Sequence, residues 1–195
     1  MTTYQSISPV RKSYTTTTTT AFGMYFTLTG ILGNSGLTSA MLSFISAKKV
    51  TNPIFYLASL LENGTNRTSM RAINTSLVSA GVSKKSANVT QAVNVVNEGD
   101  SGSIASFNAN STTAAEKFTH VTEEIEFWKS NPYVDSFAEY VTNCDEIKEW
   151  ADSNSIKFDA YYARCRDVAN VATPEEIADY MVATFDTLKL VDYVT

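Results

Sequence analysis

The sequence predicts an all-α protein, a helical bundle with an extended N-terminal arm. Four segments within residues 113–190 place apolar side chains at helical spacing between capping and turn signals. Further helical patterns occur within residues 21–97, and a threonine-rich segment precedes them. We therefore expect two parts, an arm at residues 1–20 and one helical domain at residues 21–195.

The expected arm ends in a tyrosine and six consecutive threonines. A β-branched polar tract resists helix formation and buries little apolar area, so it should be extended. Chain termini stay poorly ordered unless something holds them, and we expect a neighbouring subunit or a bound partner to do so. The residues predicted to form this assembly arm are Tyr14, Thr15, Thr16, Thr17, Thr18, Thr19 and Thr20.

Residues 21–112 are rich in Ser, Thr and Asn, and apolar spacing predicts several short elements there. Asn52 and Pro53 have the pattern of a helix cap followed by proline in the first turn. The expected elements are helices at 21–47, 52–61 and 67–80, a segment at 86–97 that fits either a helix or a strand, and a loop at 98–112.

Residues 113–195 give a clearer pattern of four amphipathic helices joined by short turns. Thr113 and Glu116 have the spacing of a capping box, and Thr173-Pro174 with Glu176 predicts a second helix start. The apolar stripes of the four expected helices lie within 118–128, 137–150, 158–168 and 177–188. Short turns between such helices favour a bundle.

Charge divides the chain in two. Residues 1–112 carry eight Lys and Arg against three Asp and Glu, a net charge of +5, and residues 113–195 carry seven against seventeen, a net of −10. These add to the net −5 of the whole chain. A chain divided in this way is suited to attract the opposite half of its own copies, or to turn its basic face toward a polyanion.

Residues 13–47 contain no charged side chain, yet glycines and threonines interrupt the segment, so no membrane span is predicted. No signal peptide is predicted either. Five Asn-X-Ser/Thr sequons are interpreted as chance in an Asn- and Thr-rich chain, and glycosylation is the alternative. Cys144 and Cys165 are expected to be two buried thiols, with a disulfide as the alternative.

Catalysis has few candidate groups, and we predict no catalytic, cofactor-binding or metal-binding residue. His120 is the one histidine and is expected at the edge of a helix, partly exposed. A zinc site would need more His and Cys than the chain holds. The segment from Asp152 lacks the glycine and glutamate of a calcium loop, and the acidic run 123–126 is expected to be a solvated face.

Two kinds of surface remain as candidates for binding. The aromatic residues of the acidic half are expected to be mostly core, with an exposed aromatic patch as the alternative. Basic residues in the first half fit a phosphate-binding surface, because phosphate contacts dominate nucleic-acid affinity. The residues predicted to contact nucleic acid are Arg67, Arg71, Lys84 and Lys85.

These observations favour a non-enzymatic structural subunit that assembles with copies of itself through its arm and its complementary charged faces. A viral or phage coat or filament protein that contacts nucleic acid is the sharper form of this hypothesis, and would place the chain in a virion. The alternative is a small helical adaptor or inhibitor that binds a partner protein through the acidic, aromatic half. An enzyme is the third choice.

Overall fold

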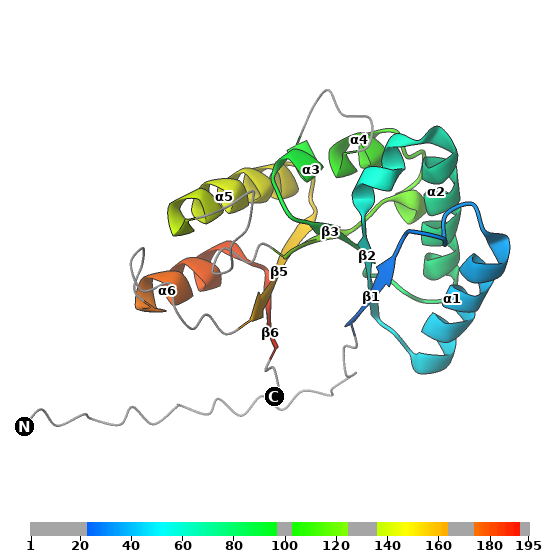
Figure 1. The fold of residues 1–195 in the computed structure, drawn as a ribbon, viewed down its shortest axis with the longest axis horizontal. Coiled ribbons are helices and arrows are strands. Elements are labelled where there is room, and N and C mark those ends of the chain that lie inside the picture. The colour runs from blue at the N-terminus through cyan, green and yellow to red at the C-terminus, as the bar shows by residue number, and fades with distance from the viewer. Residues whose placement is uncertain (1–22, 97–102, 125–135, 164–173, 192–195) are drawn as a thin grey trace, which may run out of the picture.

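The computed structural model describes residues 23–96, 103–124, 136–163 and 174–191 (Figure 1). In this part of the chain six parallel strands form one sheet, and their order in the sheet is their order in the sequence. The strands are β1 (Gly23–Thr27), β2 (Asn52–Tyr56), β3 (Ser86–Val89), β4 (His120–Glu123), β5 (Lys157–Ala163) and β6 (Thr187–Val191). The helices are α1 (Ser35–Lys48), η1 (Ala58–Glu62), α2 (Gly64–Ser79), α3 (Val93–Val96), α4 (Ile104–Ala109), η2 (Ala114–Glu116), α5 (Phe137–Ser153) and α6 (Pro174–Thr184).

The prediction of an all-α bundle is wrong, because strands alternate with helices along the chain. In the acidic half, α5 and α6 are two of the four expected helices, but the other two segments contain β4 and β5. The apolar residues of such short segments fit a helical period and a strand period about equally well. Pairing with neighbouring strands then decides the conformation, and the sequence pattern alone does not reveal that pairing.

The basic half also differs from its prediction. The segment 21–47 contains β1 before α1, and the helix expected at 52–61 is β2 followed by η1. α2 confirms the helix expected at 67–80. The ambiguous segment 86–97 contains both β3 and α3, and α4 lies within the expected loop. The expected arm, Tyr14 and Thr15 to Thr20, lies outside the described residues.

All the helices of the described chain lie on one side of the sheet, where they form an arc around it (Figure 1). This follows from the strand order. Each strand pairs in parallel with the next in the sequence, so every connection crosses in the same direction. Parallel crossovers are nearly always right-handed, which places successive helices on the same face of the sheet. The opposite face, here called the inner face, therefore receives no helix from these connections.

The core lies between the sheet and the arc of helices, and aromatic rings connect its parts. The ring of Phe118, which precedes β4, lies 6.3 Å from that of Phe55 on β2 and 5.1 Å from that of Phe107 on α4. Asn108 fixes this contact, because its side chain accepts from the Phe118 N–H at 2.9 Å and donates to the Phe118 carbonyl at 3.0 Å. All three phenylalanines are buried.

The capping box expected at Thr113 and Glu116 is confirmed, although the helix that it caps, η2, is a single turn. Its carboxylate accepts from the backbone N–H of Thr112 at 2.7 Å and of Thr113 at 3.4 Å. The Thr112 hydrogen bond is the main reason that the pKa of Glu116 is lowered. In the described residues, no helix combines the length and the apolar character needed to cross a bilayer.

Replacement of Phe118 tests how much the contact of its ring with Phe55 and Phe107 contributes to the stability of the fold. Phe118→Ala should lower the free energy of unfolding by roughly 3–5 kcal/mol, because it removes a buried ring and leaves a cavity. Urea unfolding followed by circular dichroism measures the change. Val182→Ala on α6 is the control, because Val182 is 73% exposed and should change stability by less than about 0.5 kcal/mol. Equal effects of the two substitutions would contradict the assignment.

Candidate ligand-binding face of the sheet

The strands separate apolar from polar side chains because neighbouring residues of a strand point to opposite faces. The helix-facing positions belong to the hydrophobic core and include Phe55, Ala87, Val89, Val121, Phe158 and Ala160. The alternating positions make up the inner face, and they are Tyr25, Thr27, Asn52, Ile54, Tyr56, Ser86, Asn88, His120, Thr122, Lys157 and Asp159. Most of the inner-face side chains on β3, β4 and β5 are polar.

Three of these residues form a row across the sheet. Asn88 on β3 pairs in register with Thr122 on β4, which pairs with Asp159 on β5. Their exposed fractions are 5% for Asn88 and 0% for the other two. Within the described residues, Asn88 Oδ1, Thr122 Oγ1 and Asp159 Oδ1 have no hydrogen-bond partner. We call Asn88, Thr122 and Asp159 the polar row.

Buried polar atoms without partners are uncommon, because each loses its hydrogen bonds to water without replacement. Here three of them lie on adjacent strands and on one face of the sheet. Asn52 Nδ2, on β2 and on the same face, is another such atom, and so is Asp159 Oδ2, whose contact with Lys84 is an ion pair. A set of unpaired donors and acceptors in one place is the arrangement expected where a polar molecule binds.

An ion pair lies beside the polar row. Lys84 lies two positions before the first residue of β3, and its ammonium nitrogen is 2.6 Å from Asp159 Oδ2. The Lys84 side chain is 23% exposed, whereas the Asp159 side chain is fully buried. A buried carboxylate is costly unless a cation neutralises it, so Lys84 allows Asp159 to lie at the centre of the inner face.

Two further hydrogen bonds tie neighbouring strands together on this face. Asn88 Nδ2 donates to Glu124 Oε2 at 2.8 Å, and Ser86 Oγ donates to Asn52 Oδ1 at 2.8 Å. In the strand register Asn88 is opposite Thr122, two residues before Glu124, and Ser86 is opposite Ile54, two residues after Asn52. Both hydrogen bonds are therefore displaced by two residues in the same direction across the sheet. Such a displacement agrees with a strongly twisted sheet.

Aromatic side chains continue the polar row toward β1. Tyr56 is the last residue of β2 and is paired with Thr27 on β1. Tyr56 and Asn88 each follow directly after the Phe55–Ala87 pair of β2 and β3, so they are neighbours across these strands. The exposed fractions are 41% for Tyr56 and 37% for Tyr25, which lies on the same face. The inner face thus passes from exposed tyrosines at one end of the sheet to buried polar groups near the middle.

The four basic residues predicted to contact nucleic acid do not share one surface. Lys84 pairs with Asp159 on the inner face, whereas Lys85 is buried on the helix side and donates to the Ala115 carbonyl at 2.7 Å. Desolvation by burial lowers the pKa of Lys85. Arg67 donates to the carbonyls of η1, and the Arg71 guanidinium lies 5.7 Å from the centre of the Phe107 ring. Contact of these residues with nucleic acid stays a prediction.

Two other sequence interpretations change with the structure. His120 lies on β4 rather than on a helix, and its Nδ1 is 2.8 Å from Thr119 Oγ1. Glu123, expected on a solvated face, is buried and accepts from the Tyr140 hydroxyl at 3.2 Å. Burial, with the nearby Glu123 carboxylate, raises the pKa of Tyr140 well above its ordinary value.

Cys144 confirms the expected buried thiol, and burial raises its pKa well above the ordinary value. Cys165 lies outside the described residues.

Of the aromatic residues of the acidic half, Phe118, Tyr140, Phe158 and Phe185 are buried as expected. Across the described ranges, no three His, Cys, Asp or Glu side chains gather at one point.

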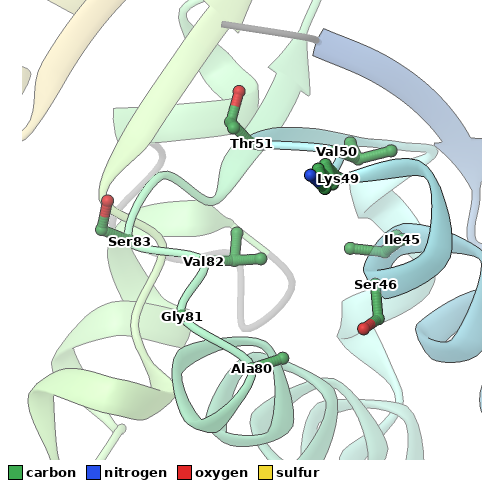
Figure 2. A pocket seen from close by; sticks show the side chains of 9 residues that line it. All are labelled: Ile45, Ser46, Lys49, Val50, Thr51, Ala80, Gly81, Val82 and Ser83. Carbon is green, nitrogen blue, oxygen red and sulfur yellow. The ribbon is translucent and has the colours of Figure 1, made fainter. Parts of the chain in front are cut away.

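A separate hollow of about 290 Å³ lies between the carboxyl ends of α1 and α2, where β2 and β3 begin (Figure 2). Ile45, Val50 and Val82 line it with apolar atoms, and Lys49 lies at its side. Unlike the inner face, this hollow contains no buried polar atom without a partner among the described residues. It is therefore a weaker candidate for ligand binding.

The fold and the inner face define an α/β protein with one apolar and one polar sheet face. No protein-family model matches this chain, and no curated protein matches it either.

The polar row was not predicted from the sequence, although a signal for it was present. Polar and apolar residues alternate over 86–89, and the same alternation occurs over 120–122 and 157–160. Such alternation is typical of a strand with one polar face. Each run is only a few residues long, and apolar residues at helical spacing within 118–128 and 158–168 overlap the last two.

The Lys84–Asp159 ion pair gives a test of this geometry. Lys84→Met leaves a fully buried carboxylate without a cation and should lower the free energy of unfolding by roughly 3–5 kcal/mol. Adding Asp159→Asn to that variant should restore most of the loss, because no buried charge then remains. Denaturant unfolding of both variants measures the coupling.

The matched control is Lys157→Met, which removes an exposed lysine paired with Asp186 at 3.0 Å. Pairs at the surface contribute less than about 1 kcal/mol, so this variant should be close to the wild type. An equal loss in Lys84→Met and Lys157→Met would show that the Lys84–Asp159 pair is not buried in solution.

Proposed function

We propose that this protein binds a small polar molecule on the inner face of its sheet. The observation that carries the proposal is the polar row, in which neighbouring strands each present a buried polar atom without a partner. A ligand that formed those hydrogen bonds would remove the desolvation penalty of the unpaired atoms, which lowers the stability of the unliganded chain. Water molecules can fill the same role, and the experiment below distinguishes the two.

The position of the row in the fold supports the proposal. Asn88 and Thr122 lie in the carboxyl halves of β3 and β4, and Glu124 follows the end of β4, whereas Asp159 is the third of the seven residues of β5. Ligands of parallel α/β sheets bind at the carboxyl ends of the strands, where the connections to the helices leave room. Small-molecule sites also combine aromatic walls with a few polar groups, and the inner face offers Tyr56 beside Asn88.

The proposed activity is binding without catalysis. The polar row supplies an amide, a hydroxyl and a carboxylate that is already neutralised by Lys84. These groups suit recognition, whereas nucleophilic catalysis needs a nucleophile within hydrogen-bond reach of a base.

A thermal-shift screen tests the proposal. Sugars, polyols, amino acids, organic acids and nucleosides at millimolar concentration are added to the full chain, and at least one should raise its Tm, because a ligand of the native state stabilises it. Thr122→Val removes one unpartnered oxygen at nearly constant volume and should abolish the shift. Asn88→Ala is a second variant with the same expected loss.

Thr142→Val is the matched control, because Thr142 is exposed on α5 and its hydroxyl bonds only to its own helix at the Ala138 carbonyl. This variant should keep the full shift. If no compound raises the Tm of the wild type, or if Thr122→Val and Asn88→Ala keep the shift, the inner face is not a ligand site and its polar atoms bind water.

Self-assembly as a structural subunit is the second candidate function, and the position of β1 favours it. β1 is the terminal strand of the described sheet, and it contains no charged residue and no proline. Edge strands without such residues are templates for pairing with another chain. The opposite net charges of the two halves of the chain would add attraction between copies.

Light scattering over a range of protein and salt concentrations tests self-assembly. The wild type should form particles larger than a monomer at high protein concentration, and these should dissociate as salt screens the charges. Tyr25→Lys places a charge on β1 and should favour the monomer, whereas Val182→Lys on the exposed face of α6 should not. A wild type that is monomeric throughout would contradict self-assembly.

A further inference from the structure

We infer that two copies of this protein pair through an exposed side of α1, in an antiparallel contact across a two-fold axis. The inference rests on the second candidate function, self-assembly, and names the surface through which two copies meet. Three observations support it: an exposed apolar stripe on α1, the order of large and small side chains along that stripe, and its position beside the terminal strand β1.

α1 carries two apolar stripes, and the core uses only one of them. Met41 and Ile45 are buried in the core. A second stripe, here called the outer stripe, consists of the exposed residues Leu37, Ala40, Phe44 and Ala47. The exposed fractions of its two large side chains are 50% for Leu37 and 38% for Phe44. The alternating steps of three and four residues along the outer stripe are those of helices that pack against each other in pairs.

The outer stripe has the composition of an interface rather than of a solvated helix face. No charged side chain occurs in α1 before its last residue, Lys48. A surface helix normally carries charged residues away from its core face, whereas charged residues are depleted at the centres of protein interfaces. An uncharged surface is best covered by another uncharged surface, and the outer stripe of a second copy meets this condition.

The order of side-chain sizes makes the outer stripe complementary to itself. In an antiparallel pair with its two-fold axis beside Leu42, Leu37 of one copy faces Ala47 of the other, and Phe44 faces Ala40. Each large side chain then meets a small one, which allows the close packing found in protein interfaces. In a parallel pair, Phe44 would face Phe44 and Ala40 would face Ala40, so large residues would collide and small ones would leave a gap. The sizes therefore favour the antiparallel pair.

The outer stripe lies toward the edge of the sheet. The ring of Phe44 is 6.4 Å from the ring of Phe26 on β1, the terminal strand. The neighbouring residues Ile45 and Ser46 line the hollow that α1 shares with α2, so they lie on the opposite side of the helix (Figure 2). A two-fold axis perpendicular to the sheet would pair the two α1 helices and bring the two β1 strands together. The outer stripe thus extends the edge already proposed for self-assembly.

Analytical ultracentrifugation of the full chain tests the inference, over a range of protein concentrations in which the wild type assembles. Ala40→Glu places a carboxylate opposite Phe44, where it would lose water without gaining a partner. We expect this variant to raise the dissociation constant of the dimer at least tenfold. Ala72→Glu is the matched control, because Ala72 is also an exposed alanine within a helix, α2, and this variant should assemble as the wild type does.

Disulfide trapping tests the antiparallel register. In the double variant Leu37→Cys with Ala47→Cys, each new thiol should face a new thiol of the second copy, and mild oxidation should give a covalent dimer. The two positions lie about 15 Å apart along one helix, too far for a disulfide within the chain. Each single variant should stay uncrosslinked, because its thiols would be equally far apart across the axis. Cys165→Ser is included in every cysteine variant, and Cys144 is buried.

The results separate this inference from self-assembly itself. If the wild type assembles and Ala40→Glu assembles equally well, α1 is not the contact, although copies still meet through another surface. If the single cysteine variants cross-link as fully as the double variant, the antiparallel register is wrong. If the wild type is monomeric at every concentration, self-assembly and the α1 contact are both wrong. Should Ala40→Glu lose its native circular dichroism, Ala47→Glu replaces it, because it places the same charge opposite Leu37.

Discussion

The rest of this structure depends on one constraint, the packing of every described helix on the same face of a parallel sheet. Sequential strand order and crossovers of one hand produce this arrangement. The core then has a single layer, in which Phe55, Phe107 and Phe118 join the sheet to α4. Because one sheet face supplies the hydrophobic contacts, the other is free of the requirement to be apolar.

The inner face uses that freedom at a cost in stability. Asp159 is fully buried beside Thr122 and Asn88, and Lys84 contacts only one of its two oxygens. A row of apolar side chains at the same positions would avoid unpaired polar atoms. Polar groups held in unfavourable surroundings are typical of functional sites, where the cost is recovered when a ligand binds. Stability and the proposed ligand binding thus belong to opposite faces of one sheet.

Prediction from the sequence succeeded for helices with clear ends and failed for strands. α2, α5 and α6 were expected, and Pro174 begins α6 as its position in the sequence indicates. β4 and β5 were predicted as helices, because Phe118 and Val121, like Phe158 and Tyr161, are spaced for a helix. Val121 also lies between polar His120 and Thr122, and Phe158 between Lys157 and Asp159, as in a strand. A strand of four to seven residues contains too few positions to separate the two periods.

The sequence by itself determined that α2, α5 and α6 are helices, that Cys144 is buried, and how charge divides along the chain. These properties depend on local spacing and composition. Only the tertiary structure decided that segments far apart in the sequence pair as strands, and that Asn88, Thr122 and Asp159 meet in one row. The physical reason is that strand pairing is a long-range interaction, so a polar residue in a short alternating run gains its surroundings only when the neighbouring strands arrive.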